Sequence, residues 1–321
     1  MHAASSIVVF FSILFPTKAW FSPNHPLTVD IRPQGDVTLV LTDFAGKAIE
    51  SQAGAAEISG EKTVDLKQVF PPSTAPGTYV LYAVPKGKQL PEFVGTPLVV
   101  SVREDKRRGA PTGTMVTKVE PLRYAVINTE HGPLTCVFYY DVAPHTSDNF
   151  LTLAEGGYFD GLTFHRIVPG FVIQGGDPRG DGTGGPGYQI DAEFSDRQHL
   201  EGVLSMARGG DPNEMSGMMP RPEFANSAGS QFFVCLDYAN TQQLDRKYTA
   251  FGKVVDGMDA VKKIAATPIA DPRNGKPQTP QVIKSVEVKA VTARENPYTK
   301  LAPQVARPES SSNGAVMPKD D

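Results

Sequence analysis

Residues 164–177 read FHRIVPGFVIQGGD, and this stretch decides the fold of the C-terminal half of the chain. It lies in a region where strand-like apolar runs alternate with glycine-rich loops. On its N-terminal side, residues 124–130 and 134–142 are apolar runs on either side of His131-Gly132-Pro133, which predicts a hairpin. One helix is expected from Pro144 to Gly156, and a second is expected to start near Asp256. Two helices among many antiparallel strands favour a closed barrel with plugged ends.

Three motifs in this half resemble one known family. They are FHRIVPGFVIQGGD at 164–177, GVLSMAR at 202–208 and NSAGSQFFV at 226–234, followed by Leu244-Asp245 and AFGKV at 250–254. In order, spacing and residue type they resemble the cyclophilins. The resemblance implies that residues 118–290 form a mainly β domain, an eight-stranded antiparallel barrel capped by two helices. It also implies peptidyl-prolyl cis/trans isomerase activity in an outer groove, with no cofactor and no metal.

The chemistry of proline isomerisation explains which residue types such a groove needs. Amide resonance resists rotation of an X-Pro bond with a barrier of about 18–20 kcal/mol. Catalysis therefore needs no nucleophile, only a site that binds the twisted amide better than either planar isomer. In the twisted amide the nitrogen regains a lone pair, to which a fixed cationic donor can hydrogen-bond. Arg166 suits this role because its guanidinium is always charged and its donors form a rigid fork.

Further site residues follow from the family's pattern. Gln174 matches the residue that holds the arginine, so Arg166 and Gln174 are the predicted catalytic pair. The predicted proline slot consists of Phe171, Met206, Phe233 and Leu244. The backbone of the peptide is expected to lie along Ala207, Arg208 and Gln231, with the main chain of Arg208 anchoring it. Tyr248 is expected to close the pocket with its ring. Regular strand alternation places His165 on the face opposite Arg166, which favours a structural role for it.

The sequence departs from the family's pattern at several positions. Gln243 and Tyr248 stand where many eukaryotic members have Trp and His, which puts tight ciclosporin binding in doubt, and Arg208 replaces a common Asn. The loop over residues 209–224 is longer than usual. Its three methionines and Phe224 form either an adaptable apolar rim beside the groove or a cover for the barrel edge. The glycine-rich residues 180–187 match the family's turn and lack the pattern of a phosphate or calcium loop.

The composition fits a soluble protein of about two domains. The chain has 321 residues, 40% of them hydrophobic, and a net charge of −4. It has no basic cluster of the kind that binds nucleic acid, so the expected partners are unfolded or flexible proline-containing polypeptides. Residues 20–103 predict a β-sandwich, immunoglobulin-like in strand spacing, of unknown role. Residues 104–117 predict a linker, and residues 291–321 predict a disordered tail.

The N-terminus predicts export. Residues 3–15 carry no charge and are too short to span a membrane, and Thr17-Lys18-Ala19 offers small residues where a signal peptidase cleaves. Residues 1–19 are therefore assigned to a signal peptide, the location to the periplasm or outside the cell, and no integral span to the mature chain. The alternative is an apolar strand or helix of the first domain. Cys136 and Cys235 are either two buried thiols or one disulfide.

A second function from a different class stays open at this point. A proline-peptide-binding or scaffold protein would use the same groove with little turnover. The presence of Arg166 argues against it, because a pure binder does not need the cation. The sequence does not predict the oligomeric state or the client proteins.

Overall fold

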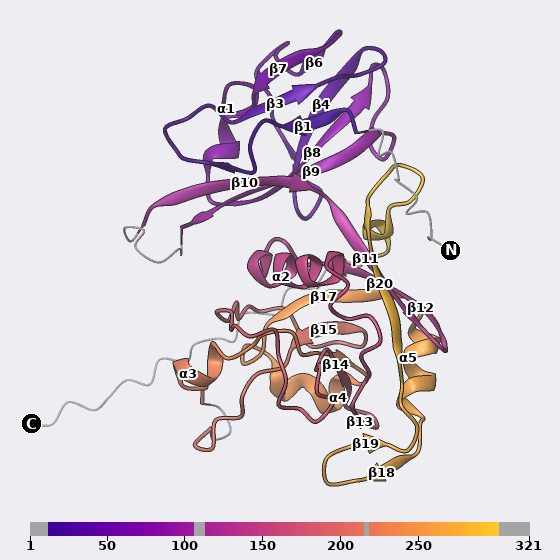
Figure 1. The fold of residues 1–321 in the computed structure, drawn as a ribbon. Coiled ribbons are helices and arrows are strands. Elements are labelled where there is room, and N and C mark those ends of the chain that lie inside the picture. Colours follow the sequence, from indigo (N-terminus) through magenta and orange to yellow (C-terminus); the bar gives the residue numbers. More distant parts are fainter. Residues whose placement is uncertain (1–11, 106–112, 215–217, 302–321) are drawn as a thin grey trace, which may run out of the picture.

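The computed structural model describes residues 12–105, 113–214 and 218–301, which form two β-rich units (Figure 1). The N-terminal unit lies above the C-terminal unit in this view. In the described residues, none of the helices combines the length and apolarity that a membrane crossing requires. The fold is mainly β, as predicted.

The C-terminal unit is built on one sheet of eight antiparallel strands. Its order is β13-β14-β16-β15-β17-β12-β11-β20. An antiparallel bridge between Thr163 and Val282 joins the two edges and closes the barrel. The strands are β11 (Arg123–Thr129), β12 (Gly132–Phe138), β13 (Arg166–Val168), β14 (Val172–Gly175), β15 (Val203–Met206), β16 (Phe232–Cys235), β17 (Ala250–Asp256) and β20 (Ile283–Ala290). The predicted barrel is confirmed.

Two helices pack against the barrel, as expected. Helix α2 (Pro144–Glu155) buries Phe150 and Leu151, and helix α5 (Met258–Ala265) buries Val261 and Ile264. The remaining elements of this unit are short: α3 (Pro222–Ala225), α4 (Tyr238–Thr241), η2 (Gln242–Leu244), β18 (Ile269–Asp271), β19 (Lys276–Pro277) and η3 (Pro297–Lys300).

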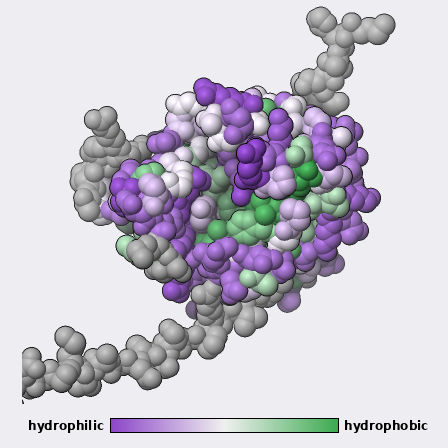
Figure 2. Space-filling view, turned by 90° about the horizontal axis from the view of Figure 1, so that it is seen from below, coloured by the Kyte–Doolittle hydropathy of each residue, from purple (hydrophilic) through white to green (hydrophobic). Residues whose placement is uncertain are grey.

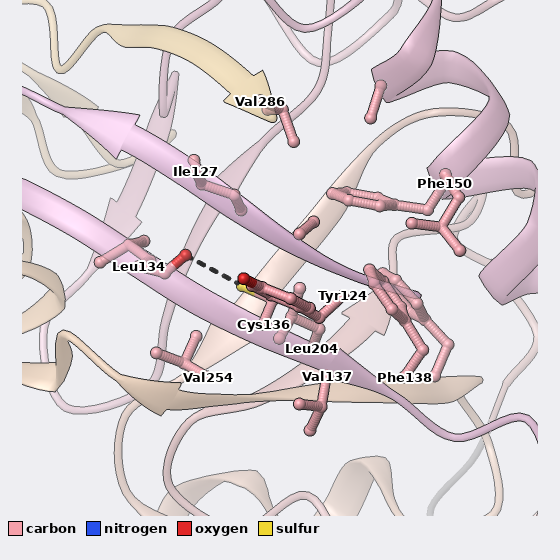
Figure 3. Close-up of a cluster of buried hydrophobic side chains, with 14 of the residues drawn as sticks. Tyr124, Ile127, Leu134, Cys136, Val137, Phe138, Phe150, Leu204, Val254 and Val286 are labelled. Carbon is pink, nitrogen blue, oxygen red and sulfur yellow. Dashed lines mark hydrogen bonds between the residues drawn. The ribbon is translucent and has the colours of Figure 1, made fainter. Parts of the chain in front are cut away.

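Aromatic rings fill the barrel core beneath α2. Phe150 stacks on Phe159 with ring centroids 4.8 Å apart and meets the edge of Phe232 at 5.3 Å. Figure 3 shows Cys136 within this core, beside Tyr124, with its Sγ directed at the Leu134 carbonyl oxygen. Cys136 and Cys235 are both free and fully buried, so the prediction of two core thiols is confirmed. Burial raises the pKa of both thiols, which keeps them protonated.

The N-terminal unit consists of two sheets that enclose a second core. The larger has the order β2-β10-β9-β8-β4-β5, with β6 also paired to β4, and the smaller has the order β1-β3-β7. Their elements are β1 (Leu14–Pro16), β2 (Trp20–Phe21), β3 (Thr28–Ile31), β4 (Val37–Asp43), β5 (Ala48–Ile49), β6 (Glu57–Ile58), β7 (Lys62–Asp65), α1 (Leu66–Val69), η1 (Pro71–Thr74), β8 (Gly77–Pro85), β9 (Val94–Glu104) and β10 (Met115–Pro121).

The first unit extends beyond its predicted limits at both ends. Strand β10 pairs with β9 from Met115 to Pro121, so the chain passes to the barrel at Leu122 and not at residue 117. Val116 and Val119 alternate inward along β10, which is why this part of the predicted linker is strand. At the other end, Leu14 is buried in strand β1, as in the alternative of an apolar strand. Residues 1–11 and 106–112 lie outside the described part, and export stays a prediction.

The predicted disordered tail is wrong for residues 291–301. Val291 is fully buried, and the Tyr298 hydroxyl donates to the Arg123 carbonyl oxygen at 2.8 Å and accepts from the Phe138 amide at 3.2 Å. Val291, the Tyr298 hydroxyl and the Asn296 side chain that caps η3 together anchor this polar segment on the barrel. The rest of that prediction, residues 302–321, falls outside the described residues.

Charged side chains join the two units. Lys118 Nζ lies 2.5 Å from Asp148 Oδ2 on helix α2 and 2.9 Å from Glu120 Oε1. Arg103 of β9 approaches the same Asp148 oxygen at 3.6 Å, and the Thr78 hydroxyl donates to the Tyr140 carbonyl oxygen at 3.0 Å. Burial raises the pKa of Glu120, an effect that its contacts with Lys118 and Arg123 oppose.

Candidate functional site

A cavity of about 220 Å³ lies on the outside of the barrel, over strands β13, β14 and β16. We call it the slot. Most of its lining residues are apolar, and arginine and glutamine side chains complete the lining. They are Arg166, Phe171, Val172, Gln174, Ala207, Arg208, Phe233, Leu244 and Tyr248. The structure therefore brings together eight of the predicted site residues.

Strand register explains why Arg166 meets Gln174. Arg166 of β13 is paired with Gln174 of β14, and Gln174 is paired in turn with Phe233 of β16. Cross-strand partners point to the same face of a sheet, so these three side chains share the outer surface. His165 is buried and does not line the slot. Burial lowers the pKa of His165, which favours its neutral form.

A chain of hydrogen bonds holds the Arg166 guanidinium from behind. Arg166 donates to Gln174 Oε1 at 3.2 Å, and Gln174 Nε2 donates to Gln231 Oε1 at 2.9 Å. Gln231 Nε2 donates to the carbonyl oxygens of Gly182 and Gly184 at 3.0 and 2.8 Å. These hydrogen bonds fix the orientation of the Gln174 and Gln231 side-chain amides. Gln231 therefore supports Gln174 directly.

The glycine-rich turn that receives Gln231 is wrapped around one buried carboxylate. Asp177 Oδ1 accepts from the Arg179 amide at 2.8 Å, and Oδ2 accepts from the Gly182 amide at 2.5 Å. Burial alone raises the pKa of Asp177, but these backbone hydrogen bonds outweigh it and the pKa is lowered. A Cβ on Gly184 would lie 2.0 Å from Asp177 Oδ1, so only glycine fits there. These contacts give the turn a structural role, the one that the sequence assigned to it.

Met206, a predicted slot residue, does not line the slot. It packs in the barrel core with Leu204 and Phe232, because side chains of a strand alternate between two faces, whereas Phe233 and Leu244 belong to a separate cluster. Ala207, the next residue, lines the slot instead. Val172 lines the slot and was missed, since an apolar residue in an apolar strand carries no signal that separates slot from core.

The far wall of the slot is formed by rings. Tyr248 packs edge-on against Phe233, with ring centroids 5.8 Å apart. Beneath Phe233, the His199 ring is stacked at 6.2 Å and its two nitrogens lie 3.0 Å from Asp245 Oδ1 and 3.0 Å from the Ser205 hydroxyl. His199 and Ser205 are fully buried, so the hydrogen-bonded Asp245, His199 and Ser205 cannot reach a substrate. Their role is to support the Phe233 ring.

A larger hollow of about 690 Å³ adjoins the slot and shares Gln174, Ala207 and Arg208 with it. Gln231 lines this hollow, which places it beside the slot as predicted. Figure 2 views the molecule from below and shows apolar surface gathered in a hollow, with hydrophilic surface around it. A groove with one apolar recess and polar edges suits an extended peptide with a single apolar ring.

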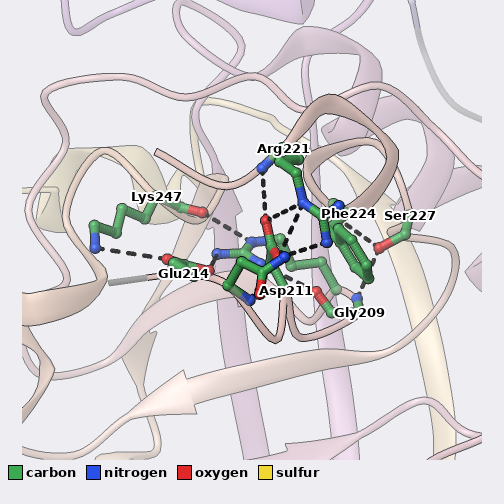
Figure 4. Close-up of polar contacts among 9 residues, drawn as sticks. Gly209, Asp211, Glu214, Arg221, Phe224, Ser227 and Lys247 are labelled. Carbon is green, nitrogen blue, oxygen red and sulfur yellow. Dashed lines mark hydrogen bonds and ion pairs between the residues drawn. The ribbon is translucent and has the colours of Figure 1, made fainter. Parts of the chain in front are cut away.

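The long loop over residues 209–224 is fastened by ion pairs (Figure 4). Arg221 binds Asp211 through Nε and Nη2, the latter at 2.9 Å from Oδ1, and also lies over the Phe224 ring at 4.7 Å. Met218 and Met219 are more than half exposed, while Met215 falls outside the described residues. Neither methionine lines the slot or the adjoining hollow, so the choice between a rim and a cover stays a prediction, and Phe224 contributes to anchoring the loop.

Comparison with known proteins places the C-terminal unit. Residues 124–288 match the family described as cyclophilin type peptidyl-prolyl cis-trans isomerase/CLD. A peptidyl-prolyl cis-trans isomerase of Synechococcus elongatus is 44% identical over 132 residues, which cover 41% of this chain and 80% of that protein. One of Helicobacter pylori is 39% identical over 145 residues, covering 44% and 79%. A cyclophilin type isomerase of Cryptosporidium parvum, known from a crystal structure, is 32% identical, with 53% of this chain and 98% of that one covered and a TM-score of 0.46.

Proposed function

Since this chain belongs to the cyclophilin-type peptidyl-prolyl cis-trans isomerase family, we propose that Arg166 is the group that catalyses rotation of the X-Pro bond in its slot. The family match, over residues 124–288, begins in β11 and ends in β20. The observation that supports Arg166 is its position: its guanidinium lines the same small cavity as Phe171, Phe233 and Leu244. A cation and an apolar recess that can hold a proline ring therefore line the same cavity.

In this proposal the slot binds the proline ring and Arg166 donates a hydrogen bond to the prolyl nitrogen as the amide twists. The nitrogen accepts only after resonance is lost, so this bond strengthens in the transition state and stabilises it selectively. Gln174, bonded to Arg166 at 3.2 Å, holds the guanidinium in place and presents its amide to the peptide. The neighbouring hollow, lined by Ala207 and Gln231, receives the residues before the proline.

The test is a protease-coupled isomerase assay on wild type, Arg166→Ala and Arg166→Lys, with a short X-Pro peptide. We expect Arg166→Ala to lower kcat/KM by about a hundredfold or more, the usual effect of removing one transition-state donor. Arg166→Lys keeps the charge without the fork and is expected to recover only part of that loss. If Arg166→Ala retains wild-type kcat/KM, the proposed role of Arg166 is excluded. If wild type and Arg166→Ala show the same near-background rate while the peptide still binds, the result favours a scaffold that binds without turnover.

We also propose that the protein is exported and assists the folding of exported proteins. The uncharged residues 3–15 followed by Thr17-Lys18-Ala19 support this proposal. Cleavage after Ala19 would remove strand β1, so the burial of Leu14 favours the alternative of an apolar strand. In that case the N-terminal unit is a tether, a client-binding module or a dimerisation surface. Fractionation of cells that express the full chain, with mass measurement of the recovered protein, tests export. An intact chain that begins at Met1 and stays in the cytoplasm would contradict it.

A further inference from the structure

The Arg208 side chain is withdrawn from solvent next to the slot. It is only 2% exposed, although arginine side chains are rarely buried without a partner. Its Nε donates to the Lys247 carbonyl oxygen at 3.1 Å, and its Nη1 donates to the Gly209 carbonyl oxygen at 3.0 Å. Its Nη2 donates to Glu214 Oε2 at 2.7 Å. The guanidinium is thus held on three sides by hydrogen bonds.

The fourth contact of this guanidinium is with the wall of the slot. Arg208 Cζ lies 4.3 Å from the centroid of the Tyr248 ring, a cation–π contact, and the same ring packs edge-on against Phe233 with centroids 5.8 Å apart. Tyr248 therefore contacts both Arg208 and Phe233, and all three line the slot. Three acceptors fix the plane of the Arg208 guanidinium. The Tyr248 ring can therefore stack on this plane in one orientation only.

Glu214 connects this contact to the long loop. It is the residue of loop 209–224 that pairs with Arg208, and its other oxygen, Oε1, lies 3.6 Å from Lys247 Nζ. Figure 4 shows Glu214 beside Lys247 and the Asp211–Arg221 pair in the same loop. The two ion pairs differ in their aromatic neighbour, since Arg221 lies over Phe224 and not over Tyr248, and in burial, since the Arg221 side chain is 45% exposed.

We propose that Arg208 and Glu214 are positioning residues that fix the Tyr248 ring and so set the width of the slot. This inference rests on the proposed function of the slot. The predicted role of Arg208 was a main-chain contact with the peptide, and the side chain adds a second role. The chemical consequence is a preference between ring sizes: a wall held in place favours contact with the five-membered ring of proline over the six-membered ring of pipecolic acid, and a loosened wall reduces this preference.

The experiment compares two peptides that differ only in proline or pipecolic acid, with binding measured by calorimetry and turnover by the coupled assay. In wild type we expect the proline peptide to be preferred. In Glu214→Gln, which keeps the shape of the side chain and removes its charge, we expect this preference to fall about fivefold, the equivalent of about 1 kcal/mol for a partly desolvated cation–π contact. Arg208→Lys is expected to lose the preference as well, because an ammonium does not stack as a plane.

Arg221→Gln is the matched control, since it breaks an ion pair of the same loop without touching Tyr248. We expect it to keep the wild-type preference for proline. If Glu214→Gln also keeps that preference, or if Arg221→Gln loses it equally, the positioning role is overturned. The binding data separate this outcome from failure of the proposed function. A preference that depends on Glu214 without any turnover would uphold the positioning role and contradict the isomerase mechanism, whereas turnover with an unchanged preference would do the reverse.

Discussion

Replacement of Gly184 by alanine tests whether the glycine-rich turn holds the catalytic arginine in place. The added Cβ would lie 2.0 Å from Asp177 Oδ1 and 3.0 Å from the Arg179 amide nitrogen. Ordinary contact distances of about 3.5 Å mean that the carboxylate or the turn must move by more than about 1 Å. A displacement of that size breaks at least one hydrogen bond of the Asp177 carboxylate.

The magnitude follows from what the turn carries. A hydrogen bond to a buried charge contributes about 1.5–3 kcal/mol, so Gly184→Ala is expected to lower the free energy of unfolding by about 2–3 kcal/mol. Gly184 also supplies a carbonyl oxygen that accepts from Gln231, which supports Gln174 and through it Arg166. Misplacement of a catalytic group by about 1 Å costs up to a hundredfold in rate, and we expect kcat/KM to fall by at least about tenfold.

The control is the adjacent residue. A Cβ on Gly185 has nothing within 4 Å and its backbone is not in the left-handed region, so Gly185→Ala is expected to behave as wild type. Thermal unfolding measures stability, and the protease-coupled assay at low temperature, where uncatalysed rotation is slow, measures kcat/KM. Wild-type stability in Gly184→Ala would show that the turn does not depend on Asp177. Lower stability with unchanged kcat/KM would show that the turn does not hold Arg166.

Three further predictions concern stability. The lowered pKa of Asp177 means that its ionised form stabilises the fold above its ordinary pKa near pH 4 and that this contribution is lost as the pH falls through the lowered value. The gap in unfolding free energy between wild type and Asp177→Asn is therefore expected to be constant above about pH 5 and to shrink below about pH 4; a constant gap would contradict this assignment. Tyr298→Phe removes two hydrogen bonds to the barrel backbone and is expected to cost about 1–2 kcal/mol in urea unfolding, whereas no cost would mean that residues 291–301 contribute little. Asp148→Ala leaves Lys118 and Arg103 without their shared carboxylate and is expected to cost about 3 kcal/mol and to speed proteolysis between the units, while exposed Asp259→Ala serves as the control.

Much of the slot was accessible from the sequence because its residues stand at fixed distances within short motifs. Arg166, Phe171 and Gln174 lie on one hairpin, so their mutual placement needs only strand pairing. The prediction that Met206 lines the slot failed for a physical reason. Alternation of side chains separates the two faces of a strand but does not say which face points into the barrel. Both Val172 and Met206 are apolar, and only the closed barrel assigns the first to the slot and the second to the core.

The amino-acid sequence by itself determined the family, the barrel with its two helices, and the cation and apolar ring residues of the slot, because motif order and periodicity are properties of the chain. Only the tertiary structure decided which groups support them. Contacts such as Arg208 with Glu214 and Tyr248, or Tyr298 with the backbone of Arg123, join segments whose separation in the chain says nothing of their distance in space. The same holds for β10, since its pairing with β9 is what makes it part of the first unit.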